Sequence, residues 1–145
     1  MNRMMRLFVA FVFLGFAMPA QAAHRPAVDG DKAAIRHVIQ SQLDAFQKDD
    51  GVTAFRFSTP GLRARFQDSA HFMRMVRENY RPVYRPSQIS FGALDSVDTN
   101  TRVQHMLVVG SDGNTHEALF VMEHQKDGKW LIAGCFLMES DLTAT

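Results

Sequence analysis

Hydrophobic positions follow a helical period in the first part of the chain and an alternating period in the last part. Between residues 31 and 48, apolar side chains recur at steps of three and four residues, with charged side chains on the opposite side. This spacing is typical of an amphipathic helix that buries one face. The sequence therefore predicts a helix from about Asp31 to Lys48, with an inward stripe of Ile35, Val38, Ile39, Gln42, Leu43 and Phe46.

Shorter helices are predicted after this one. Asp49-Asp50-Gly51 ends the long helix and caps a second helix over Val52 to Phe57. Thr59-Pro60 has the order typical of a helix start, with an N-cap followed by proline at the first helical position. Asp68 caps a further helix that turns Phe72, Met75 and Val76 inward. The segment over 81–86 holds two prolines and cannot be helical throughout, since residues before proline are pushed toward extended backbone.

Four alternating segments follow Pro86 and predict an antiparallel meander. Asp-Gly pairs at 112–113 and 127–128 are strong hairpin signals between them. Helices followed by such a meander indicate an α+β fold, with the N-terminal helices packed on one face of a sheet of about four strands. We expect one domain over residues 31–140, with strands near Gln88–Val97, Thr101–Gly110, Thr115–Gln125 and Lys129–Glu139.

The hairpins also predict which side chains share a face. With two-residue turns at the Asp-Gly pairs, His105 faces the helices together with Phe120 and Cys135. A bulge or the reverse assignment of the two faces is the alternative. In the predicted register the opposite face carries six apolar residues, which suggests a homodimer interface. These six are Met106, Leu119, Val121, Ile132, Phe136 and Met138.

The N-terminus has the pattern of a secretory signal. Arg3 and Arg6 precede an uncharged apolar run over 7–17, and Ala20-Gln21-Ala22 supplies the small residues of a cleavage site. The run is about half of the roughly 20 residues that a membrane-spanning helix needs. We expect cleavage after Ala22, a periplasmic or secreted protein without a membrane span, and a flexible tail over 23–30.

Charge is distributed unevenly along the chain. The sequence has 16 basic and 15 acidic residues, yet 56–85 holds seven arginines against two acids, and 95–145 holds eight acids against three bases. The interpretation we favour is a solvated helical face that complements the acidic half. Contact between the arginines and an anionic membrane surface is the weaker alternative, and we expect no nucleic-acid partner.

Several kinds of chemistry lack the residues they need. A single cysteine excludes an internal disulfide and a cysteine-rich zinc site. In the predicted register, His105 lies ~13 Å from both His116 and His124 at the rise of a strand, too far to share a metal ion. The nucleotide and nucleophile-elbow motifs are absent as well. We expect no metal and no cofactor, and Cys135 is interpreted as a small core residue.

Polar residues near the junction of helices and sheet are the candidate ligand-binding residues: Gln42, Tyr80, Tyr84 and Arg85, with His105 from the sheet. They could form the rim of a pocket for a small anionic or aromatic ligand. The alternative, which we favour, is a polar network that ties the segment over 81–86 to the first helix. Another alternative is an isomerase or lyase that uses His105 as base, with Tyr80, Tyr84 or Arg85 orienting the substrate.

A resemblance adds to this picture. The residues that carry it are IRHVIQSQLDAF over 35–46, Asp49-Asp50, Ala54-Phe55, Pro60, Phe72, Met75-Val76, Tyr80 and Val83-Tyr84-Arg85-Pro86. Together they are similar to an uncharacterised exported bacterial family, domain of unknown function 4864. The helices, the long sheet and the final hairpin at Asp127–Ile132 resemble the cone fold of the nuclear-transport-factor-2-like superfamily.

The superfamily implies an open cone with a pocket, and frequent dimerisation, but no single activity. Its isomerases, dehydratases and epoxide hydrolases use inward Asp or His sets, and this sequence has no matching set. We therefore expect a non-enzymatic domain that binds a small ligand or a protein partner in or around a cone-shaped pocket, as a homodimer.

Overall fold

The computed structural model describes residues 25–140, and the predicted signal over 1–22 lies outside them. Helix α1 (Arg25–Gln47) begins earlier than the sequence predicted, so residues 25–30 of the expected tail form its first turns. Pro26 is compatible with this start, because a first-turn residue needs no N–H for the helical ladder. Among residues 25–140, no helix is both long and apolar enough to cross a membrane.

The shorter helices begin where the capping residues predicted. The side chains of Asp50, Thr59 and Asp68 accept hydrogen bonds from backbone N–H groups three residues later, as N-caps do. One further helical turn lies over 81–84 and ends before Pro86, in agreement with the restriction that proline imposes. The four helices are α2 (Gly51–Arg56), α3 (Pro60–Phe66), α4 (Ser69–Asn79) and α5 (Arg81–Tyr84).

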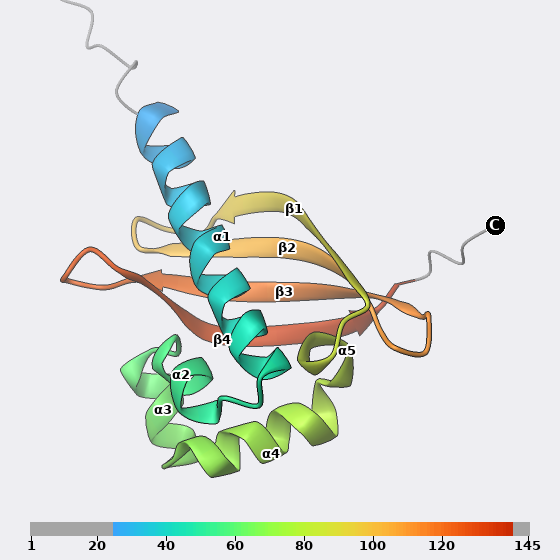
Figure 1. Cartoon of the computed structure of the whole chain (residues 1–145). Helices are drawn as coiled ribbons and strands as arrows, with labels where there is room; N and C mark the ends of the chain where they lie inside the picture. Colours follow the sequence, from blue (N-terminus) through green and yellow to red (C-terminus); the bar gives the residue numbers. More distant parts are fainter. Residues whose placement is uncertain (1–24, 141–145) are drawn as a thin grey trace, which may run out of the picture.

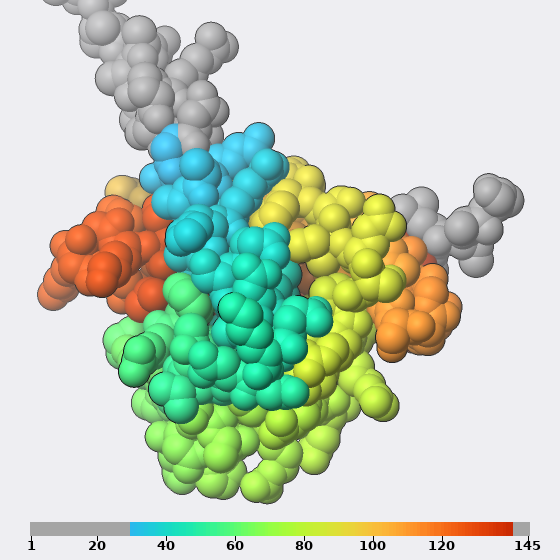
Figure 2. Space-filling view, viewed as in Figure 1, coloured from blue at the N-terminus to red at the C-terminus, as the bar shows by residue number. Residues whose placement is uncertain are grey.

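Four antiparallel strands form one sheet in the order β1-β2-β3-β4, and the helices lie on one face of it (Figure 1). The predicted α+β fold is confirmed. In the space-filling view, α1 stands in front of the sheet, and the helices after it gather below α1 (Figure 2). The strands are β1 (Gln88–Ser96), β2 (Thr101–Val109), β3 (Thr115–His124) and β4 (Trp130–Glu139).

The core lies between α1 and the inner face of the sheet. Ile35 and Ile39 from α1 are fully buried, and so are Ala118 and Met122 from β3. Every second residue of β3 faces the helices, as the alternation of a strand requires. This apolar contact accounts for the packing of the helical layer on the sheet.

The prediction of which β2 side chains face the helices is wrong, because the register of β2 against β3 differs from the predicted one by one residue. Val109 pairs with Thr115, so five residues connect β2 and β3 instead of the two-residue turn that was expected. A shift of one residue exchanges the two faces of a strand. Met106 therefore lies in the core, and His105 and Leu107 lie on the opposite side of the sheet.

The predicted β3–β4 register holds for part of the hairpin, where Phe120 pairs with Cys135. It shifts next to Ala133, where a bulge turns Ile132 inward. We call the face turned away from the helices the outer face. Of the six apolar residues predicted there, Met106 and Ile132 are buried in the core instead. The other four follow the outer alternation: Leu119, Val121, Phe136 and Met138.

A second bulge lies in β1, at Gly92 and Ala93. The buried Gln104 amide donates to the carbonyl oxygens of both residues, at 3.1 Å each. The bulge reverses the alternation of β1, so that Leu94 pairs opposite the inward Gln104 and the following residue, Asp95, turns to the outer face.

Candidate ligand-binding cavity

A cavity of about 650 Å³ lies between the edge strand β4 and the helices α3, α4 and α5, with α1 and β3 behind it. Its floor is apolar and buried. Phe46, Phe72, Phe120 and Ile132 are each at most 4% exposed. Its mouth is open to solvent, since Arg65 and Asn79 are exposed and Phe136 is 61% exposed. The cavity is therefore a recess that deepens from the molecular surface toward the core.

Two attachments of the β4 backbone border this cavity. The N–H of Ile132 donates to the Phe57 carbonyl at 2.8 Å, and its carbonyl accepts from the Thr59 N–H at 2.9 Å. Further along β4, the Tyr80 hydroxyl donates to the Cys135 carbonyl at 3.0 Å. These bonds satisfy backbone groups that an edge strand otherwise leaves open, and they fix β4 relative to the helices.

Two of the predicted ligand-binding residues, Gln42 and Tyr80, line the cavity. Gln42 is 3% exposed, and its amide nitrogen donates to the Ala54 carbonyl at 3.1 Å. Burial raises the pKa of the Tyr80 hydroxyl above its ordinary value. Both residues therefore present neutral groups to the cavity.

Cys135 also lines the cavity, and burial raises the pKa of its thiol to about 12. A thiol of such high pKa stays protonated near neutral pH and is a poor nucleophile. This agrees with the interpretation of Cys135 as a packing residue.

Tyr84 and Arg85 do not line the cavity; they bind Asp49, just after the end of α1. The Tyr84 hydroxyl donates to Asp49, Arg85 forms an ion pair with the same carboxylate at 2.9 Å, and Arg85 also donates to the Phe46 carbonyl. The Tyr84 hydrogen bond, with the Arg85 charge, holds the pKa of Asp49 below its usual range. These contacts form a polar network that ties α5 to α1, as expected under the alternative that we favoured from the sequence.

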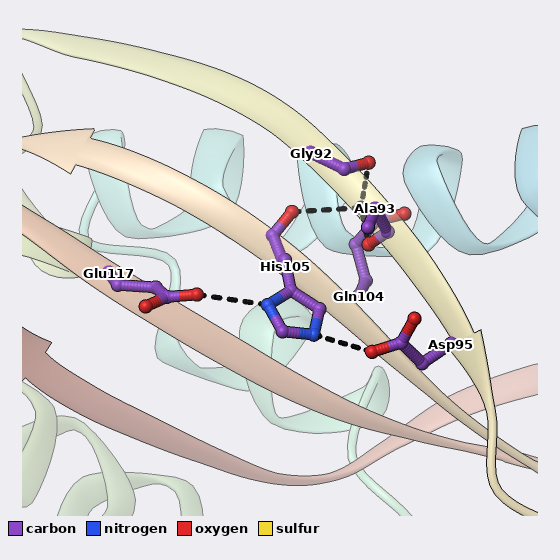
Figure 3. Close-up of polar contacts among 6 residues, drawn as sticks. All are labelled: Gly92, Ala93, Asp95, Gln104, His105 and Glu117. Carbon is purple, nitrogen blue, oxygen red and sulfur yellow. Dashed lines mark hydrogen bonds and ion pairs between the residues drawn. The ribbon is translucent and has the colours of Figure 1, made fainter.

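His105 lies on the outer face and is not among the residues that line the cavity. Its prediction as an inward residue is wrong, because the β2–β3 connection is longer than a two-residue turn. Figure 3 shows its ring between two carboxylates: Nδ1 is 2.9 Å from Glu117 and Nε2 is 2.8 Å from Asp95. The structure does not bring His105 together with Tyr80, Tyr84 or Arg85, so it does not form the acid–base site considered from the sequence.

Arg65, Asn79 and Phe136 line the cavity but were not among the ligand-binding residues predicted from the sequence. Arg65 was grouped with the charged surface of the helices, and Phe136 with the dimer face. The pairing of Leu62 with Phe66 on one face of α3 was the available signal, since both residues line the cavity. Which strand this helix faces is decided by tertiary packing, so the spacing alone was insufficient.

The two carboxylates beside His105 should raise the pKa of its ring, which a titration can measure. The Glu117 hydrogen bond is the main cause that raises the pKa of His105 above 6.5; Asp95 adds to this, and burial opposes it. Because the pKa is raised in the folded state, the cluster stabilises the fold fully below pH 6.5 and loses this effect as pH rises through the folded pKa. We expect an NMR titration of the His105 ring to give a midpoint above 6.5.

Glu117→Gln should lower this midpoint, because it removes the negative partner of Nδ1. Glu123→Gln, an exposed acid on the same strand, is the matched control and should leave the midpoint nearly unchanged. A midpoint at or below 6.5 in the unsubstituted protein would contradict the contact of the His105 ring with both Glu117 and Asp95.

Comparison with known proteins gives a family and no close neighbour. A search of curated proteins and a search of solved structures return no match. A family model described as "Domain of unknown function (DUF4864)" matches residues 28–145, which is most of the chain and includes α4, α5 and the whole sheet. The chain therefore belongs to the DUF4864 family.

Proposed function

We propose that this domain binds a small, largely apolar ligand in the β4 cavity. The observation that carries the proposal is a cavity of about 650 Å³ with a buried apolar floor and an open mouth. Small-molecule sites typically enclose about 300–1,000 Å³ and are lined mainly by hydrophobic and aromatic side chains, with few polar groups. The resemblance to the cone fold of the nuclear-transport-factor-2-like superfamily supports a pocket at this place, between helices and curved sheet.

We propose that the domain binds this ligand without catalysing a reaction on it. The described residues that line the cavity include no Asp, Glu or His, the groups that most often transfer protons in active sites. Tyr80 and Cys135 are held in their neutral forms by burial. The secretory pattern over 1–22 supports an exported domain that meets its ligand in the periplasm or outside the cell.

Filling the cavity should weaken ligand binding without unfolding the protein. Met75 is half-buried on α4 and lines the cavity, so Met75→Trp places an indole in the space that a ligand would occupy. We expect the neutral fluorescent probe N-phenyl-1-naphthylamine to bind the unsubstituted protein saturably. Met75→Trp should weaken this binding by about tenfold or more, a loss of about 1.4 kcal/mol.

Val52→Trp is the control for this variant, because Val52 is 56% exposed on α2 and does not line the cavity. It should bind the probe as the unsubstituted protein does, and thermal unfolding should show that both variants fold. Equal probe binding by all three folded proteins would refute the cavity as the site.

A second candidate function is self-association through the outer face. Leu107, Phe136 and Met138 are 39%, 61% and 42% exposed there, and Leu119 pairs across the strands with Phe136. Exposed apolar patches on soluble domains commonly mark interfaces. We propose that two copies of the chain pack these faces together as a homodimer.

This interface predicts a charge-sensitive dimer. Leu107→Asp places a second carboxylate directly across the strand from Glu117 and should raise the dimer dissociation constant at least about tenfold, since burying an unpaired charge is costly. Val52→Asp makes the same kind of change on the helical side and should leave the constant unchanged. The measurement is sedimentation equilibrium at roughly 1–100 micromolar protein, the range in which a dimer of modest affinity dissociates. A strict monomer over that range would contradict the homodimer.

A further inference from the structure

We infer that the ligand of the β4 cavity is an amphiphile with an apolar body and one anionic head group, which binds with its body in the cavity and its head at Arg65. A medium-chain fatty acid is the simplest member of this class. The inference rests on the proposed function and adds the chemical class and the orientation of the ligand.

The interior of the cavity favours hydrocarbon. Apart from Arg65, the described lining residues carry no charged side chain. The Tyr80 hydroxyl proton is given to the Cys135 carbonyl, and Gln42 donates to the Ala54 carbonyl. A charged group placed among these residues would lose its hydration without gaining a charged partner, which is strongly unfavourable. An apolar body meets no such penalty.

The mouth of the cavity favours an anion. Arg65 is exposed on α3, and within residues 25–140 its guanidinium has no hydrogen-bonded or ion-paired partner. Guanidinium presents a planar fork of donors that matches a carboxylate or phosphate. The described residues of the lining include no carboxylate that would compete for this fork or repel an anion.

The charge of the surrounding helices points the same way. The segment over 56–85, which includes α3, α4 and α5, has seven arginines against two acidic residues, and the Asp49 carboxylate pairs with two of these arginines, Arg77 and Arg85. A local excess of one charge raises the concentration of oppositely charged ligands near a site and speeds their association. Arg74 belongs to this excess but does not line the cavity, so it allows the direct contact to be separated from the general field.

The experiment compares three ten-carbon amphiphiles as competitors of the neutral probe, each below the concentration at which it forms micelles. These are decanoate, decanol and decyltrimethylammonium. We expect decanoate to compete about fivefold better than decanol, the effect of an exposed ion pair with charge-assisted hydrogen bonds. Decyltrimethylammonium should compete least. Arg65→Gln should remove the advantage of decanoate and keep the affinity for decanol, and the matched Arg74→Gln should keep both.

The outcomes separate this inference from the proposed function. If decanoate and decanol compete equally, or if Arg65→Gln and Arg74→Gln reduce decanoate binding to the same extent, the anionic head at Arg65 is refuted while the apolar cavity stands. If none of the three amphiphiles displaces the probe and the probe itself is insensitive to Met75→Trp, the proposed function fails as well.

Discussion

The two hydrogen-bonded attachments of β4 to the helical layer fix the geometry on which the cavity depends. Ile132 is held by the backbone of Phe57 and Thr59, and the Cys135 carbonyl is held by the Tyr80 hydroxyl. The bulge at Ala133 lies between these two points, where β4 changes its register against β3. Because all three features border the cavity, its shape follows from how one edge strand meets the helices and from no single motif in the sequence.

The sheet separates His105 from the cavity residues Gln42 and Tyr80, although the sequence analysis grouped them in one candidate site. The inner face closes the core and the cavity, whereas the outer face carries exposed apolar residues around the cluster of Asp95, His105 and Glu117. The bulge in β1, held by Gln104, turns Asp95 to the side where it can reach His105. A ligand in the cavity and a partner on the outer face would contact neighbouring surfaces that share Val121 and Phe136, since both residues follow the outer alternation and also line the cavity.

Much of the fold was predictable because its signals are local. Caps at Asp50, Thr59 and Asp68, the stripe of α1 and the four strands all depend on residues close in sequence. The position of His105 was not predictable, because the length of the β2–β3 connection sets the face of a whole strand. Among the residues that line the cavity, the sequence analysis named Gln42 and Tyr80 but not Arg65, since the contact of α3 with β4 joins segments about 70 residues apart.

The proposal of an apolar cavity as the ligand site is tested most directly by NMR of methionine methyl groups. Met75 lines the cavity, whereas Met138 lies on the outer face and does not line it. Added decanoate should shift the Met75 methyl signal saturably and leave the Met138 signal in place. A shift of Met138 without any change at Met75 would place the ligand on the outer face and contradict the proposed site.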